Sequence, residues 1–94
     1  MTRAERLERV LKAALEPLSI SVVDESHRHA GHAGARAEGE THYAVEILSP
    51  RFAGLTRMQR HRLVHEIVRD EFQNGLHALS LKLLAPEDSA QRGA

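Results

Sequence analysis

Seven histidines and no cysteine define the chemistry that this 94-residue chain offers. Imidazole is the commonest side-chain ligand of transition metals, and it binds through a neutral ring nitrogen. Three histidines fall in one glycine-containing run, His27-Arg28-His29-Ala30-Gly31-His32. Their spacing suits metal binding, but it equally suits a solvated polar loop, because a metal site needs about three or four ligands.

The remaining histidines differ in how the expected secondary structure holds them. His77 opens a strand with the same parity as Leu79, which makes it either a satisfied edge residue or a preoriented metal ligand. His42 starts another strand and points away from its apolar face, where a structural role is expected. On a helix, His61 is expected to be half-buried and His65 to face solvent.

No catalytic pattern accompanies the histidines. Without cysteine the chain has no disulfide, no thiol nucleophile and no cysteine-based zinc site. It also lacks the Gly-x-Ser-x-Gly turn of serine hydrolases and a glycine-rich phosphate loop. A binding module, not an enzyme, is therefore predicted.

The composition predicts one globular domain. A content of 41% hydrophobic and 28% charged residues is typical of a globular chain, and the length suits a single domain. Thirteen basic and thirteen acidic residues cancel, so the net charge does not favour nucleic acid or an anionic membrane as a partner. No apolar run approaches the roughly 20 residues that span a bilayer, and the N-terminus has no hydrophobic signal core. We expect a cytoplasmic protein that does not bind membranes.

Helices and strands are expected to alternate in the order α-β-β-α-β, over residues 3–15, 18–24, 41–49, 56–73 and 76–84. The pairs Thr2/Glu5 and Thr56/Gln59 form capping boxes at the two helix starts, and Asn74-Gly75 ends the second helix. Each strand has one apolar face, so both helices should cover one side of a three-stranded sheet. Strands one and two are expected to pair as a hairpin around a long loop, and strands two and three in parallel.

Five stretches of the sequence carry a family resemblance: Glu25-Ser26-His27-Arg28-His29, Glu40-Thr41-His42-Tyr43, Phe52-Ala53-Gly54, Arg60-His61-Arg62-Leu63-Val64 and Leu76-His77-Ala78-Leu79. Together they resemble the BolA-like family over about residues 5–86. The series of Phe-x-Gly, Arg-His-Arg and His-Ala-Leu is highly specific. The resemblance implies a type II KH-like α+β fold with a mixed sheet. It places a BolA-like domain at residues 1–86 and a polar tail at 87–94.

The resemblance also implies a function. Family members pair with a monothiol glutaredoxin and share a 2Fe–2S cluster, in cluster trafficking or in iron and redox regulation. The glutaredoxin contributes its active-site cysteine and the thiol of glutathione. This chain would contribute His77 and His29, with His27 and His32 as alternates for the loop ligand. Alone, it is expected to hold no tightly bound cofactor.

An alternative prediction is a KH-like, DNA-binding regulator of transcription in stress responses. The basic second helix favours it, whereas the small number of aromatic residues and the absence of a Gly-x-x-Gly loop count against it. The sequence leaves open whether the free chain forms a homodimer. The partner or nucleic-acid interface is expected at Phe52, Gly54, Arg60, Arg62 and Ala78.

Overall fold

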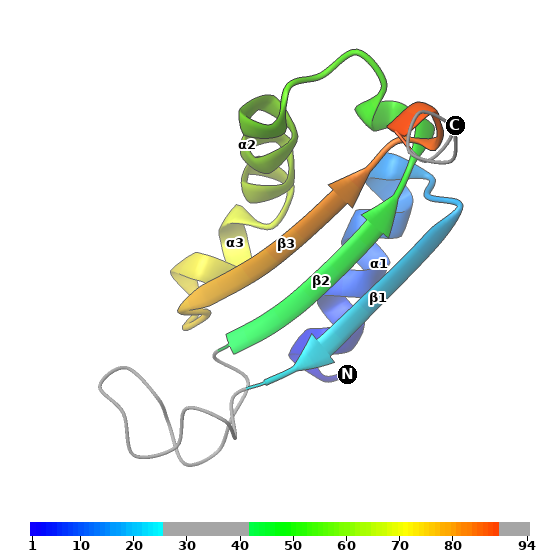
Figure 1. Ribbon diagram of the computed structural model, residues 1–94. Helices are drawn as coiled ribbons and strands as arrows, with labels where there is room; N and C mark the ends of the chain where they lie inside the picture. Colours follow the sequence, from blue (N-terminus) through cyan, green and yellow to red (C-terminus); the bar gives the residue numbers. More distant parts are fainter. Residues whose placement is uncertain (26–41, 89–94) are drawn as a thin grey trace.

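The computed structural model describes residues 1–25 and 42–88 of the chain (Figure 1). In chain order the elements are α1 (Arg3–Leu15), β1 (Ser19–Asp24), β2 (His42–Leu48), the 3-10 helix η2 (Pro50–Phe52), α2 (Arg57–Ile67), α3 (Arg69–Gln73) and β3 (Ala78–Leu84). The predicted α-β-β-α-β order is confirmed, and each strand begins and ends within two residues of its predicted bounds. Over the described residues, no helix has the length and apolarity to cross a membrane.

The strands form one mixed sheet in the order β1-β2-β3. Strand β1 runs antiparallel to β2, and β3 runs parallel to β2. Figure 1 shows α1, α2 and α3 on the same side of this sheet, which confirms the predicted two-layer α+β architecture. Because of these directions, the end of β1 and the starts of β2 and β3 meet at one end of the sheet.

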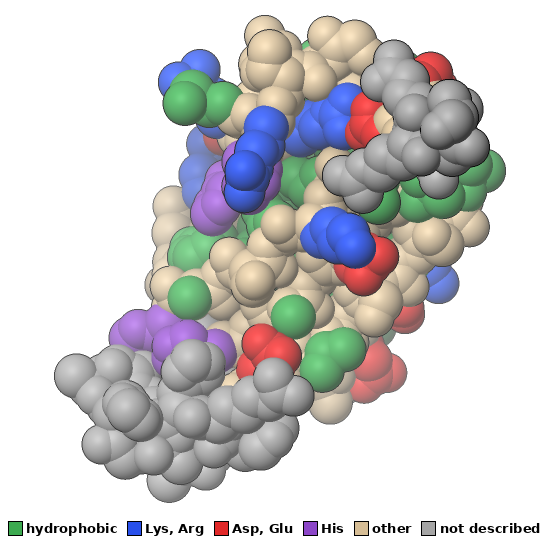
Figure 2. Space-filling view, viewed as in Figure 1, with side chains coloured by type: hydrophobic (Ala, Val, Ile, Leu, Met, Phe, Trp, Pro, Cys, Tyr) green, Lys and Arg blue, Asp and Glu red, His purple; other side chains and the backbone are tan. Residues whose placement is uncertain are grey.

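The core lies between the sheet and the helices. As the alternation predicted, Tyr43, Val45 and Ile47 share one buried face of β2. Their Cα partners on β3 are leucines: Leu79, Leu81 and Leu83. The buried hydrophobic residues of this core are Leu7, Leu11, Leu15, Tyr43, Val45, Ile47, Phe52, Val64, Val68, Leu76, Leu83 and Ala85. The opposite face of the sheet has no helix over it in the described part of the chain, and it is the face seen in Figure 2.

Helix α1 follows its sequence signals closely. The Thr2 side chain accepts from the Glu5 N–H at 3.2 Å and the Glu5 carboxylate accepts from the Thr2 N–H at 3.0 Å, which completes the predicted capping box. The helix ends at Leu15, and its C-cap residue Glu16 has a left-handed φ of 44°, directly before Pro17. A capping box also opens α2, from Thr56 and Gln59.

The prediction of one continuous helix to residue 73 is wrong. The helix is interrupted at Val68, which has φ −102° and ψ 14°, and α3 follows as a separate short helix. Neither glycine nor proline marks this position. Val68 is 1% exposed, and beyond it the Glu71 carboxylate binds Arg3 at 2.9 Å and Arg6 at 3.0 Å on α1. The interruption therefore coincides with contacts between distant parts of the chain, which local periodicity does not report.

Candidate metal centre at the end of the sheet

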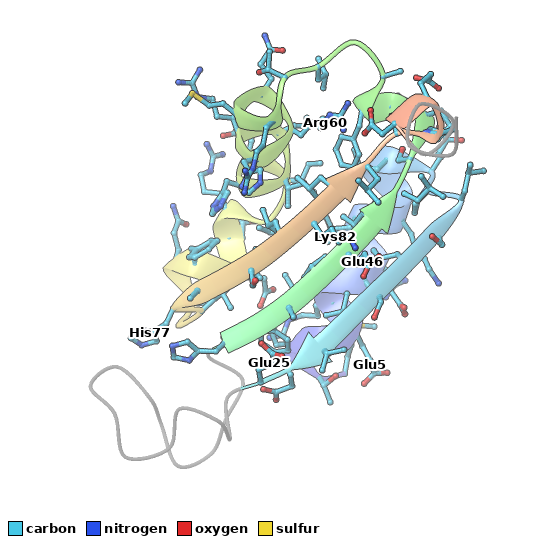
Figure 3. The ribbon with its side chains drawn as sticks, viewed as in Figure 1. Glu5, Glu25, Glu46, Arg60, His77 and Lys82 are labelled. Carbon is cyan, nitrogen blue, oxygen red and sulfur yellow. The ribbon has the colours of Figure 1, made fainter. Side chains whose placement is uncertain are left out.

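His77 directly follows a tightly closed helix end. Gly75 has φ 114°, and the Leu76 N–H donates to the Glu71 carbonyl at 2.9 Å, the long hydrogen bond of a Schellman motif. Leu76 is 4% exposed and anchors the turn in the core. The backbone before His77 is therefore fixed, while the His77 side chain itself is exposed at the end of the sheet (Figure 3).

The His42 ring lies beside the His77 ring. Their centroids are 5.9 Å apart and their planes differ by 8°, within the range of offset stacking. The sequence favours a structural role for His42 over a ligand role, and its local pattern gives no link to His77. The signal was available, because parallel strands begin at the same sheet end, and the register pairs His42 with Ala78.

Glu25 and His42, the described residues on either side of 26–41, meet at this end of the sheet. The Glu25 N–H, at the end of β1, donates to the His42 carbonyl at 2.8 Å. The predicted loop ligand His29 and its alternates His27 and His32 lie outside the described residues. Within residues 1–25 and 42–88, no group of three or more His, Cys, Asp or Glu side chains could hold a metal ion. The described part of the chain thus brings a pair of imidazoles to this site, not a complete ligand set.

Arg60 links the connection before α2 to the end of β3, away from His77 at the start of that strand. Its guanidinium donates to the Leu55 carbonyl at 3.0 Å and to the Leu83 carbonyl at 3.2 Å, and it forms an ion pair with Asp88. It also lies over the Phe52 ring, 6.0 Å from the centroid. Asp88, which the sequence prediction placed in the tail, is therefore bound to the body of the domain.

The predicted interface residues separate into two groups. The prediction is wrong for Phe52, which is 0% exposed and offers no surface to a partner because it lies in the core. Arg60 is 13% exposed, and its donors are directed to groups of its own chain. Gly54, Arg62 and Ala78 are exposed. Gly54 has φ 78°, a left-handed conformation that favours glycine at this turn.

Two further histidines lie on α2. His61 is half-buried and lines a groove between α2 and β3, together with Arg57 and Lys82. His65 is exposed and stacks on Phe72 with a centroid separation of 5.2 Å. Figure 2 shows histidine side chains over α2 and, separately, at the end of the sheet. The expected burial of both residues is confirmed.

The fold and this site define a small α+β domain that presents a histidine pair at one end of a mixed sheet. A family model described as BolA-like protein matches residues 11–88. The chain therefore belongs to the BolA-like family, as the sequence resemblance predicted. This is not a known enzyme family.

Individual relatives agree with this assignment. The chain is 42% identical over 92 residues to Protein BOLA1, chloroplastic, of Arabidopsis thaliana, covering 96% of this chain but 58% of that protein. It is 40% identical over 77 residues to the DNA-binding transcriptional regulator BolA of Escherichia coli K12, covering 82% of this chain and 70% of that protein. Among solved structures, the BolA domain of SufE1 from Arabidopsis thaliana matches with a TM-score of 0.85 and 38% identity, covering 94% of this chain and 96% of that domain.

Proposed function

We propose that this chain is an adaptor that binds a monothiol glutaredoxin and shares a 2Fe–2S cluster with it through histidine ligands. The observation that carries the proposal is His77, an exposed imidazole held behind a Schellman turn in a chain without cysteine. Membership of the BolA-like family supports the choice of partner, because the resemblance implies this pairing. In this role the chain is a binding module and not an enzyme.

The donor set of the chain fits a shared cluster. Because the chain has no cysteine, both sulfur ligands would come from outside, namely from the glutaredoxin cysteine and from glutathione. Two imidazoles and two thiolates form a Rieske-like ligand set, which raises the reduction potential above that of an all-thiolate cluster. His77 would be one imidazole ligand and His29 the other, with His27 and His32 as alternates. Glu25 and His42, which flank the part of the chain that carries these three histidines, are joined by a backbone hydrogen bond of 2.8 Å, and this supports a ligand from that part of the chain at this site.

The test of the proposal is the visible spectrum of the reconstituted complex. Mixing the chain with a monothiol glutaredoxin, ferrous iron, sulfide and glutathione should give a heterodimer whose absorption differs from that of the glutaredoxin cluster alone. His77→Ala should abolish this difference. His65→Ala is the matched control, because it removes an exposed, stacked histidine from α2. An unchanged spectrum in His77→Ala would contradict the role of this residue.

The loop ligand can be identified in the same assay. His27→Ala, His29→Ala and His32→Ala are prepared separately, and we expect only His29→Ala to change the absorption bands. A change in one of the other two variants instead would transfer the role to that residue. If none of the three single variants changes the spectrum, the triple variant tests whether these histidines replace one another, and an unchanged spectrum there rules out a histidine ligand from residues 26–41.

DNA binding is a second candidate function. It is favoured by the relative named as a DNA-binding transcriptional regulator and by the exposed residues Arg57 and Arg62 on α2. If both arginines contact phosphates, replacing them with alanine should lower the salt slope of duplex DNA binding by about 2. Electrophoretic mobility shifts at low and moderate salt measure this slope. Absence of binding at low salt would remove this candidate.

A further inference from the structure

We propose that His42 is a positioning residue for His77, and that its ring holds the His77 imidazole ready for metal ligation. The inference rests on the proposed function, since it concerns how one cluster ligand of that site is oriented. It gives a specific role to a residue for which the sequence favours a structural role over a ligand role.

His77 needs such a contact because only its backbone is fixed by the turn before it. The Leu76 anchor and the Glu71 hydrogen bond fix where the chain enters β3. The His77 side chain is exposed and precedes the first residue of the strand, so core packing does not select its rotamer. A ligand that must give up rotamer freedom on binding loses affinity, and a neighbour that holds the bound rotamer in advance restores it.

His42 is well placed to act as that neighbour. It is the first residue of β2, it is half-buried, and its carbonyl accepts the Glu25 N–H at 2.8 Å. Its backbone therefore belongs to the sheet, unlike the backbone of His77. The two ring planes differ by 8° at a centroid separation of 5.9 Å, so one flat ring lies alongside the other in a defined orientation.

Stacking and ligation make different demands on residue 42, and substitutions separate them. Stacking requires a flat ring, whereas ligation requires a ring nitrogen. His42→Phe keeps the ring and removes both nitrogens. His42→Leu keeps apolar volume without a ring, and His42→Ala removes both. If His42 positions His77, phenylalanine at residue 42 should preserve this positioning, whereas leucine and alanine should not.

The first measurement uses the free chain and needs no cluster. In ¹H–¹³C NMR spectra, the His77 ring signals should move in His42→Ala and His42→Leu, because the ring current and the preferred rotamer are both lost. They should keep the signature of a single stacked rotamer in His42→Phe. His65→Ala, which removes the partner of Phe72 on α2, should leave the His77 signals in place. Urea unfolding of each variant verifies that it is folded.

The second measurement uses the full complex with glutaredoxin, glutathione and the reconstituted cluster. We expect the cluster in His42→Ala and His42→Leu to be lost about two- to ten-fold faster than in the unmodified complex, the range that one aromatic contact supplies. The absorption maxima should not move, since the ligands are the same. His42→Phe should restore the lifetime.

The outcomes distinguish the two proposals. If His42→Phe loses the cluster as His42→Ala does and its absorption maxima move, His42 is itself a ligand and the positioning role is overturned. Unchanged His77 signals and an unchanged cluster lifetime in His42→Ala would also overturn it. If His77→Ala leaves the spectrum of the complex unchanged, the proposed function fails at this residue, whatever the NMR spectra of the free chain show about stacking.

Discussion

Arg60 connects three separate parts of the chain through one planar side chain. Its donors reach the Leu55 and Leu83 carbonyls and the Asp88 carboxylate, and the Asp88 carboxylate also accepts the Ala85 N–H at 2.9 Å. Removing a charged donor from largely buried partners leaves those partners unsatisfied. Arg60 therefore contributes to stability through its own chain more than to an external surface.

We predict that Arg60→Ala lowers the free energy of unfolding by about 2 kcal/mol, the range for a lost hydrogen bond to a charged group. Arg60→Lys should recover little of it, because an ammonium group does not reproduce the fork of a guanidinium. Arg62→Ala, at an exposed position on the same helix, should stay within about 0.5 kcal/mol of the parent. Urea unfolding measures all three values, and equal losses in Arg60→Ala and Arg62→Ala would contradict the assignment.

Glu71 predicts a defined pH dependence. Its side-chain hydrogen bond from Arg6, with a smaller contribution from Arg3, holds the pKa of this carboxyl below its ordinary value of 4.5 against the opposing effect of burial. A lowered pKa in the folded state gives stability that is present above 4.5 and is lost as the pH falls through the lower folded value. Glu71→Gln should therefore cost about 1 to 2 kcal/mol at pH 7, and the difference from the parent should shrink below pH 4.5.

Urea unfolding as a function of pH measures this difference. Glu66→Gln is the control at pH 7, because Glu66 makes an exposed i,i+3 pair with Arg69 and should cost little. A Glu71→Gln difference that stays constant from pH 7 to well below 4.5 would show that the two arginines do not stabilise the charged form.

The residues of the candidate site were predictable to different degrees. Histidine chemistry and the absence of cysteine follow from composition, and the position of His77 follows from the Asn74-Gly75 helix end. The pairing of His42 with His77 requires the parallel register of β2 and β3, which topology could have supplied. The Arg60–Asp88 pair joins residues 28 positions apart, and no local sequence pattern predicts such a contact.

At the scale of elements, local signals predicted the starts of helices better than their continuity. The capping boxes of α1 and α2 depend on residues three positions apart, so the sequence alone contains them. The interruption at Val68 depends on a buried side chain and on ion pairs between Glu71 and α1. These contacts form only when distant elements pack, which is why a continuous helix was predicted there.

The turn between α3 and β3 should be more important for the site than other turns of the same kind. Gly75→Ala places a side chain at φ 114°, which should cost about 1 to 2 kcal/mol and displace the residue before His77. Gly54→Ala, at φ 78° in open space, should cost about 1 kcal/mol. Both variants should unfold at lower urea concentration, but only Gly75→Ala should move the His77 ring signals in NMR spectra. Equal movement of these signals in both variants would contradict a specific link between this turn and the site.

At the scale of the whole molecule, the sheet keeps the core apart from the candidate site. One face and the helices over it form the core, and the meeting of three strand ends at one end of the sheet creates the candidate site. Alternation predicted the two-layer arrangement because each strand has one apolar face. The C-terminal extent of the domain was harder to predict from the sequence, because it depends on the ion pair between Asp88 and Arg60.

This ion pair predicts that the folded domain extends at least to Asp88. A chain shortened to residues 1–88 keeps Asp88 and its contacts to Arg60 and Ala85, so it is the reference for shorter chains. A chain shortened to 1–86, the boundary expected from sequence, should lose about 1 to 3 kcal/mol, because the Arg60 guanidinium and the Ala85 N–H lose their acceptor. Asp88→Ala in the full chain should reproduce most of this loss without any truncation. Urea unfolding of the four chains measures it, and equal stability of 1–86 and 1–88 would place the boundary at residue 86 after all.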